Sequence, residues 1–450
     1  MNTSLVLGID PGKFFVVAAL MQSTGERVWK GRQYVMSREG FERLKADVPE
    51  GELTVGVEAS GRIDDNLLAW LAEWQAASPE RKIKVIRVNP GQSSRFGGFK
   101  PRRDQTDRSD AEHVSEYTRV YAHRLEAFEH DARSQAMARL VTERQRVIEQ
   151  LAATKNRIHE QLLICFPEFT RIFKNPFAQL ACAVLRQVPT AQRAAGRKAL
   201  SLGRVKADRK GRSLGVSRAG QLIQLAKRSI ASAREDNDAE AMIFMLDEVQ
   251  LLEQRLQRIK QGLVNFVDQA RKETQVPGQE GVSPARQIQL LDSIPGMAVV
   301  AAATLVLGTR GLTRFPSARA LAAQWASCPE RTQTGTSLDK TRLTNRGDHK
   351  RRAMLYLATQ VACLSDPAFA FHKWRMIQGG LRPQQAICAT MNRMARIIWA
   401  VVAHNTTYDA GQMMKQIDIH HEAQWKTFVL QLGKESKLWK KIARENRKIA

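Results

Sequence analysis

Residues 4–35, SLVLGIDPGKFFVVAALMQSTGERVWKGRQYV, decide the fold of the first part of the chain. They contain two apolar runs, Ser4–Ile9 and Phe15–Met21, and a third run, Arg27–Val35, in which polar and apolar residues alternate. Only a few residues separate the runs, which is the spacing of a β-hairpin or meander. The stretch therefore predicts three consecutive strands, the first of which ends at Asp10.

The residues that follow predict a mixed sheet covered by helices. Ser37 is the expected N-cap of a short helix. Leu53–Val57 and Ile83–Val88 are two further strands, separated by a helix around Asp64–Trp74. Three strands, then helix, strand, helix and strand, predict an α/β domain over residues 1–125.

The chain is strongly basic. Its 450 residues include 70 Lys and Arg against 45 Asp and Glu, a formal net charge of +25. An excess of this size indicates a polyanionic partner, with nucleic acid expected first and an acidic membrane surface second. The chain is also 43% hydrophobic, so we expect sizeable folded cores in two or three domains.

Membrane insertion and secretion are not expected. No uninterrupted apolar run reaches about 18 residues, the length that spans a bilayer. The opening residues, MNTSLVLGID, carry no basic segment before the apolar stretch, which argues against a secretory signal. The five cysteines are scattered without CxxC spacing, which argues against a zinc ribbon or disulfide framework and fits a reducing cytoplasm.

Residues 126–275 are dominated by two helical segments with the periodicity of coiled coils, in which apolar residues recur at steps of four and three. The two seams can pair with each other or across a dimer, and the pattern does not decide between these. The core stripe of an ordinary bundle explains the first seam equally well. The first seam comprises Met137, Val141, Ile148, Leu151, Ile158 and Leu162, and the second Met245, Val249, Leu252, Leu256, Ile259, Leu263 and Phe266.

Three further segments complete the organisation. Residues 186–230, between the seams, are rich in Arg and Lys and predict an inserted basic arm that contacts a polyanion. Residues 275–284, QVPGQEGVSP, predict a linker by their Pro and Gly content. A mostly helical domain is expected over residues 285–410, followed by a basic helical tail over residues 411–450.

Residues 89–103 interrupt the α/β pattern. Two prolines and three glycines predict a loop. Phe96 and Phe99 lie among basic residues, a combination that suits contact with nucleic-acid backbone and bases. A solvated surface loop is the alternative. The basic residues of this loop are Arg95, Lys100, Arg102 and Arg103.

Four carboxylates occupy positions where a metal site can form. Asp10 and Glu58 end strands, and strand ends at one edge of a sheet converge. Asp107 and Asp110 are three residues apart at an expected helix start and share a face, although capping is the alternative role for both. Divalent cations relieve repulsion among such carboxylates, and hard oxygen ligands suit Mg²⁺ or Mn²⁺. Paired metals of this kind act on phosphodiesters.

These residues resemble the Piv-type insertion-sequence transposases, the IS-one-ten group, which have a RuvC-like domain with a D-E-D-D set. GIDPGK (8–13) is similar to the family's G-I-D-x-x-K, and VEASG (57–61) to its E-x-[ST]-G. TDRSDA (106–111) is similar to K-T-D-x-x-D-A, although Gln105 replaces the usual lysine. The resemblance implies an RNase H/RuvC-like mixed sheet and gives catalytic, metal-binding roles to Asp10, Glu58, Asp107 and Asp110.

The last domain resembles the C-terminal transposase domain of the same family. LLDSIPGMAVVAAATLVLG (290–308) looks like its I-P-G hairpin, whose turn would bring backbone N–H groups towards a phosphate. Residues 331–360 resemble its Q-S-G segment followed by I-S-K-x-G-N-x-x-L-R. The family's serine lies directly before the glycine, where this chain has Thr334, and the nearest serine is Ser337.

The resemblance implies a DNA recombinase in which the acidic cluster and a hydroxyl build one composite site. The hydroxyl attacks a DNA phosphodiester and holds the strand covalently, while a structured bridge RNA from the element's flank pairs with DNA and selects sequence. We predict Ser337, a primary alcohol, ahead of Thr334 as nucleophile, with impaired strand transfer as the third alternative. The cationic residues expected to clamp phosphates nearby are Arg342, Arg346, Lys350, Arg351 and Arg352.

The preferred function is therefore a DNA transposase or recombinase, assembled as a homodimer or tetramer because strand exchange between two duplexes needs several active sites. A RuvC-like junction resolvase or nuclease that uses water is one alternative. An inactive nucleic-acid-binding derivative and a coiled-coil scaffold are two others. A covalent protein–DNA product separates the first two functions, and metal-dependent cleavage separates both from the last two.

The net charge predicts a steep salt dependence of nucleic-acid binding. A protein that contacts about six to ten phosphates loses about 10³–10⁵ in affinity between roughly 50 and 200 mM salt. Fluorescence anisotropy of a labelled duplex over a salt series measures this slope. A flat dependence would mean that the positive charge serves another purpose, such as solubility.

Overall fold

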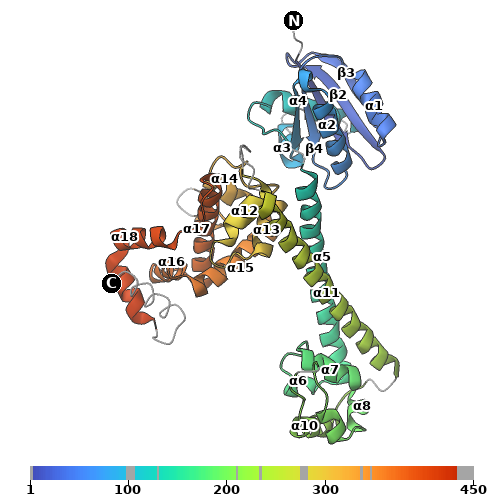
Figure 1. The fold of residues 1–450 in the computed structure, drawn as a ribbon, viewed down its shortest axis with the longest axis vertical. Helices are drawn as coiled ribbons and strands as arrows, with labels where there is room; N and C mark the ends of the chain where they lie inside the picture. The colour runs from blue at the N-terminus through green and yellow to red at the C-terminus, as the bar shows by residue number, and fades with distance from the viewer. Residues whose placement is uncertain are drawn as a thin grey trace. The chain divides into compact units, whose positions relative to one another are not determined.

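The protein is described here by a computed structural model that covers residues 4–97, 107–128, 131–208, 211–232, 236–273, 282–334, 338–344 and 347–432 (Figure 1). The chain forms two compact units, Met1–Arg133 and Ser134–Ala450.

The first unit is built on a five-stranded sheet with the order β3-β2-β1-β4-β5. β1 (Leu5–Pro11) pairs antiparallel with β2 (Phe15–Gln22), which pairs antiparallel with β3 (Arg27–Val35). β4 (Leu53–Glu58) runs parallel to β1, and β5 (Ile83–Val88) runs parallel to β4. This mixed sheet confirms the predicted fold class, and each predicted strand is present.

Helices cover both faces of this sheet. α1 (Arg38–Asp47) begins at the predicted cap, where Ser37 Oγ accepts a hydrogen bond from the Gly40 amide at 3.1 Å. α1 and α2 (Asp65–Ala77) pack on one face, where Phe41, Leu44, Leu67 and Leu71 join the odd-numbered side chains of β1 in one core. A short 3₁₀ turn, Pro79–Arg81, leads into β5.

α4 (Asp107–Tyr121) covers the opposite face and approaches it very closely. An ideal Cβ built on Gly8 would lie 2.2 Å from the Ser115 amide nitrogen, and one built on Gly56 would lie 1.9 Å from Thr118 Oγ1. Residues at these two positions must therefore lack a side chain. The α4 backbone rests directly on β1 at Gly8, and the Thr118 side chain of α4 packs directly on β4 at Gly56.

Replacement of Gly8 by Ala should push α4 away from the sheet. Because the obstructing atoms belong to the backbone, we expect Gly8→Ala to lower the free energy of unfolding by at least about 1–3 kcal/mol. Gly91→Ala is the matched control in the same unit, since the nearest atom to its Cβ would be Asn89 Oδ1 at 3.4 Å. Urea unfolding of both variants measures the difference. Equal midpoints for the two would contradict the contact described here.

The second unit contains two long helices, α5 (Ala132–Cys165) and α11 (Asp236–Glu273). They run in opposite directions, because Lys155 pairs with Glu253 at 3.0 Å and Arg157, further along α5, pairs with Glu248 at 2.8 Å. Five residues of the predicted second seam are buried: Val249, Leu252, Ile259, Leu263 and Phe266. Pairing across a dimer remains a prediction.

The predicted first seam needs one correction. Val147 is 1% exposed, whereas the predicted seam residue Ile148 is only half-buried. The buried stripe of α5 continues through Thr154, seven residues after Val147, and Ile158, four residues further on, along one helix face. Because Thr154 is polar, the sequence pattern did not show that it belongs to the buried face of α5.

The segment between the long helices is a folded module, which corrects the expectation of a basic arm. It contains a core of its own, formed with the last turns of α5 and the first of α11. Apolar side chains such as Val184, Leu202 and Leu222 fill this core, while Arg197 and Arg204 remain exposed. Its helices are α6 (Phe169–Ile172), α7 (Gln179–Gln187), α8 (Ala191–Ala195), α9 (Ala199–Gly203) and α10 (Val216–Lys227).

The C-terminal part of the second unit is mostly helical, as predicted, with one β-hairpin that was not predicted. One core joins most of its helices to the first half of α5 and the second half of α11, and a second, smaller core joins α16 to α18. The predicted basic tail begins as helix, and residues 433–450 lie outside the described part of the chain. The elements are α12 (Pro284–Asp292), α13 (Val299–Gly308), α14 (Ala318–Gln324), β6 (Pro329–Thr334), β7 (Leu338–Leu343), α15 (His349–Ser365), α16 (Pro367–Gln378), α17 (Pro383–Ala403) and α18 (Ala410–Gln431).

α17 is long and apolar enough, by length and composition, to cross a membrane, so the expectation that no segment meets this criterion was too strict. Half of its most apolar window is buried inside the protein. Met391, Met394 and Ile398 belong to the main core of the second unit. This burial is what the central helix of a folded domain requires.

Candidate active site

Asp10 and Glu58 end neighbouring parallel strands. The register of β1 with β4 runs to the pair Ile9 and Val57, so Asp10 and Glu58 are the next residues on the two strands. Side chains alternate along a strand, and Ile9 and Val57 belong to the core under α1 and α2. Asp10 and Glu58 therefore lie on the opposite face, the face that α4 covers. Both are half-buried.

α4 brings the other two predicted carboxylates to this face. It begins at Asp107, and Asp110 lies in its first turn. The carbonyl oxygen of Ala111, the next residue, would lie 2.5 Å from a Cβ on Gly8, two residues before Asp10. The structure thus places the start of α4 over the strand that carries Asp10. The side chain of Asp107 lies outside the described part of the chain.

The donor set suits a hard divalent cation, because carboxylate oxygens are the ligands that Mg²⁺ and Mn²⁺ prefer. Within the described side chains, however, no group of three or more His, Cys, Asp or Glu residues is arranged to hold a metal ion. Asp10 and Glu58 share one edge and one face of the sheet, and Asp110 lies in the first turn of the helix that covers this face. The types of residue present at this edge therefore suit a divalent metal ion.

Ser93 fixes the orientation of Glu58. Its hydroxyl donates a hydrogen bond to Glu58 Oε1 at 2.8 Å, and the residue is 4% exposed. Ser93 belongs to α3 (Pro90–Gly97), so the loop expected over residues 89–103 is wrong for its first half. Asn89 Oδ1 accepts from the Gly91 amide at 2.9 Å, and a proline follows this Asn at the first helical position. This Asn-Pro pair was the sequence signal for the helix.

α3 also contains Phe96, for which we expected contact with bases. Its ring instead packs against His113, Tyr117 and Tyr121 of the α4 region, with centroids 5.7 Å apart for Tyr117. Burial raises the pKa of Tyr117. Phe96 anchors α3 to α4. The side chain of Arg95, and all of Phe99, Lys100, Arg102 and Arg103, lie outside the described part of the chain.

A buried ion pair holds the segment that follows Glu58. Asp64 has no exposed surface, and Arg87 on β5 contacts both of its carboxylate oxygens, one of them at 3.1 Å. Arg87 also donates to the carbonyl of Gly61 at 3.2 Å. Gly61 has a φ of +73°, which a residue with a side chain rarely adopts. These contacts fix the turn directly after Glu58 and so limit its movement.

The second predicted site lies on the β-hairpin. β6 and β7 pair antiparallel, and the last described pair is Thr334 with Leu338. Ser337 lies outside the described part of the chain, as does the side chain of Thr334. In the sequence, Thr334 is the last residue of β6 and Ser337 directly precedes β7. The sequence did not reveal this hairpin because residues 329–343 are mostly polar.

The expected phosphate clamp at the start of α15 has partners inside the protein. Lys350 Nζ pairs with Glu149 on α5 at 3.2 Å, and Arg351 pairs with Asp348 at 3.0 Å. Arg352 donates to the carbonyl of Thr344 at 3.0 Å. Hydrogen bonds from Gln145 and Lys350 hold the pKa of Glu149 below its usual value. These cations therefore hold the end of the hairpin and the start of α15 in place. Arg346 and the side chain of Arg342 lie outside the described part of the chain.

The I-P-G turn between α12 and α13 packs against α15. Gly296 has a φ of +81°, and its Cβ would lie 2.3 Å from the carbonyl oxygen of Ala358. Only glycine fits this turn. Its expected contact with phosphate remains a prediction.

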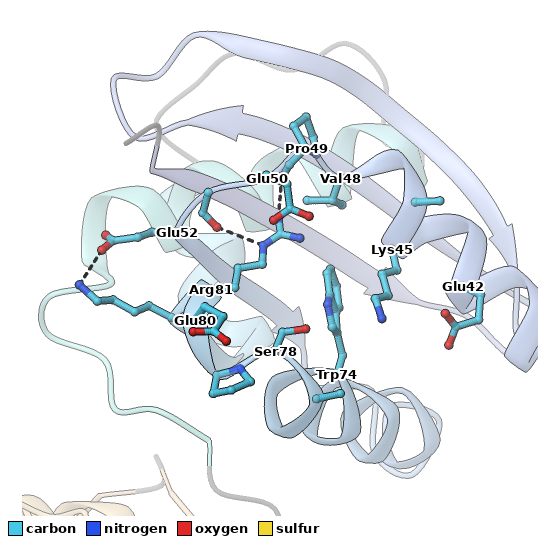
Figure 2. A pocket seen from close by; sticks show the side chains of 15 residues that line it. Glu42, Lys45, Val48, Pro49, Glu50, Glu52, Trp74, Ser78, Glu80 and Arg81 are labelled. Atoms are coloured by element: carbon cyan, nitrogen blue, oxygen red, sulfur yellow. Dashed lines mark hydrogen bonds and ion pairs between the residues drawn. The ribbon is translucent and has the colours of Figure 1, made fainter. Parts of the chain in front are cut away.

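A cavity of about 860 Å³ lies at the other ends of β4 and β5, before Leu53 and Ile83 (Figure 2). Four glutamates line it, together with Lys45, Arg81, Lys82 and the buried Trp74. Arg81 donates to the carbonyls of Pro49 and Gly51, and Lys82 pairs with Glu52 at 3.0 Å. A six-residue strand, roughly 17 Å, separates this cavity from Glu58. It is therefore distinct from the carboxylate edge.

Comparison with known proteins gives two family matches. Residues 7–167 match a model of DEDD transposases of the IS110 type, described as a transposase, and residues 288–373 match one described as the transposase IS116/IS110/IS902 family. The first match includes all four predicted carboxylates, and the second includes the hairpin and the start of α15. Residues 168–287, which contain the helical module, lie outside both.

Two relatives agree with these matches. A 43.6 kDa protein of insertion element IS110 from Streptomyces coelicolor is 24% identical over 322 residues, which cover 70% of this chain and 75% of the relative. A probable family 20 transposase from Pseudomonas aeruginosa is 28% identical over 170 residues, which cover 37% of this chain and 45% of that protein.

Proposed function

This chain belongs to the IS116/IS110/IS902 family of transposases, and from that premise we propose how its residues cut and exchange DNA strands. The carboxylates of the first unit hold divalent metal ions, Mg²⁺ or Mn²⁺, and the hydroxyl of Ser337 or Thr334 is the nucleophile. The observation that carries the proposal is the placement of Asp10 and Glu58 as neighbours on the face that α4 covers.

The carboxylates would act as a set because the fold limits their freedom. Ser93 holds one oxygen of Glu58, and the Asp64–Arg87 pair holds the turn that follows it. Such supporting hydrogen bonds orient metal ligands and tune their affinity. When bound, a divalent cation would neutralise the carboxylates and stabilise negative charge on the reacting phosphate. Asp107 and Asp110 would complete the set from the first turn of α4.

In the proposed reaction the hydroxyl oxygen bonds to a DNA phosphorus atom as the bond to one DNA oxygen breaks. The hydroxyl proton is lost, and the departing DNA oxygen takes up a proton. The strand is then held as a phosphoester of Ser337 or Thr334 until a second DNA hydroxyl reverses the step. Both residues remain candidates, since Ser337 is less crowded and Thr334 occupies the family's serine position.

We also propose a structured guide RNA and a homo-oligomer. The guide RNA is supported by the family resemblance and by the net charge of +25. The oligomer, a dimer or tetramer, is supported by the need for several active sites when two duplexes exchange strands. The cationic module between α5 and α11 offers exposed Arg and Lys side chains for a polyanion.

Asp10→Asn tests the carboxylate site. The change removes one metal-ligating charge without adding bulk, so we expect strand cleavage to be lost while nucleic-acid binding is retained. Glu39→Gln, an exposed carboxylate on α1, is the control and should cleave normally. Cleavage of the element's own ends, with Mg²⁺ or Mn²⁺ and after chelation, measures both. Unchanged cleavage by folded Asp10→Asn would exclude the proposed metal site.

Ser337→Ala and Thr334→Ala identify the nucleophile. We expect Ser337→Ala to lose the covalent protein–DNA product, because a primary alcohol attacks with less crowding. Thr332→Ala, on β6 opposite Lys340, is the matched control and should keep the product. Denaturing gels of labelled DNA after the reaction, with and without the flanking transcript, measure the adduct.

The outcomes separate the alternatives. Loss of the adduct only in Thr334→Ala would reverse our ranking and retain the mechanism. Retention in both variants would place the nucleophile elsewhere. If the unaltered protein cuts DNA with metal but never forms an adduct, the function is that of a RuvC-like nuclease or resolvase that uses water. The presence of Thr334 at the family's serine position would agree with that result.

A further inference from the structure

A cavity of about 530 Å³ lies among α16, α17 and α18, far along the chain from both predicted sites. Phe371 and Ile417 supply its buried apolar wall. His372 and Arg375 reach it from α16, and Arg393 from α17. His420 and His421 reach it from α18, at a kink where His421 has non-helical dihedral angles. None of the described side chains that line it is acidic, and the side chain of Asp418 on α18 lies outside the described part of the chain.

The two arginines are not neutralised by the described residues around them. Neither Arg375 nor Arg393 forms an ion pair within the described structure, and the side-chain contact of Arg393 is with Met413 Sδ at 3.9 Å. Burial lowers the pKa of Arg393, and the nearby charge of Arg375 lowers it further. Half-buried guanidinium groups this close repel each other and are costly without an anion.

His372 is held neutral in the cavity. The Thr390 hydroxyl donates to the carbonyl of Ala386 at 2.8 Å, so its oxygen accepts from His372 Nδ1, 3.1 Å away. Burial, Arg393 and Arg375, in that order, lower the pKa of His372 to about 4. The imidazole is therefore neutral at pH 7, chiefly because it is buried and further because both arginines carry positive charge.

We propose that this cavity binds a backbone phosphate of a nucleic acid. Arginine is the side chain best suited to phosphate, since its planar fork donates two parallel hydrogen bonds. Arg375 and Arg393 supply two such forks from different helices, and the imidazoles of His420 and His421 line the cavity beside them. A nucleic acid is favoured over a small anion because the whole chain carries +25 and its family acts on DNA. The proposal rests on the proposed function for this choice of partner.

Arg375→Gln and Arg393→Gln test the cavity in the full-length protein. The matched control is Arg396→Gln, three residues along α17, exposed and outside the cavity lining. Affinity for labelled duplex DNA and for the labelled flanking RNA is measured over a salt series. We expect each cavity variant to weaken binding about tenfold at low salt and to reduce the slope of log affinity against log salt by about one. The control should change neither quantity.

The probe whose binding changes, duplex DNA or RNA, identifies the nucleic acid that supplies the phosphate. A change with duplex alone assigns the cavity to DNA, and a change with the transcript alone assigns it to RNA. Normal affinity and slope with both probes for the two folded variants would overturn the proposal. The test measures binding only, so it can fail while the carboxylate site stands, and Asp10→Asn can fail while this cavity stands.

A measurement on the unaltered protein covers the case in which an arginine variant does not fold. The His372 imidazole faces Arg375 on its own helix, Arg393 and Thr390 on α17, and His420 and His421 on α18, with Tyr408 and Asp366 beside Arg393. A bound phosphate compensates the arginines, so the pKa of His372 should rise towards about 6.5. Phosphate affinity should then increase as the pH falls.

Histidine NMR titrations with a short duplex, the transcript and inorganic phosphate follow this pKa. We expect a rise with at least one nucleic acid at micromolar concentration. A His372 resonance that is unmoved by saturating nucleic acid would overturn the proposal. A response to high inorganic phosphate alone would also overturn it, since that result describes an adventitious ion only.

Discussion

The first unit depends on the direct contact between α4 and the sheet. Because Gly8 has no side chain, the α4 backbone lies directly against β1, and because Gly56 has none, the Thr118 side chain of α4 packs against β4. That contact decides where the first turn of α4 lies relative to the ends of both strands. The two glycines therefore decide how closely the start of α4 approaches the strands that end at Asp10 and Glu58.

The strands that carry Asp10 and Glu58 could be predicted because each is a continuous apolar run that ends at a charged residue. Their shared face followed from the period of two along a strand. α3 was missed because the prolines and glycines of residues 89–103 outweighed the capping signal of Asn89 and Pro90. The module after α5 was missed for a similar reason, since Arg and Lys between its few apolar residues obscured a helical pattern that tertiary packing completes.

The partners of the cationic side chains could not be predicted from sequence. Lys350 pairs with Glu149, which lies 201 residues earlier, and such a pair exists only once α5 packs against the C-terminal core. Arg351 and Arg352 likewise serve the local structure through Asp348 and the carbonyl of Thr344. Arg375 and Arg393, which the sequence did not single out, are the arginines without an ion pair in the described structure around their cavity. Net charge predicts a polyanionic partner, but only the packed structure shows which cationic side chains have no ion pair among the described residues.

The helical module has a consequence for how the protein can vary. It begins where α5 ends and finishes where α11 begins, and these two points are adjacent, because Gln161 Nε2 lies 3.5 Å from the carbonyl oxygen of Asp238. A segment whose two ends lie side by side can be lengthened, shortened or exchanged without shifting the helices that hold it. The residues outside both family matches include this segment. The chain can therefore change the surface it presents at the end of the helix pair while its carboxylate edge and hairpin keep their local structure.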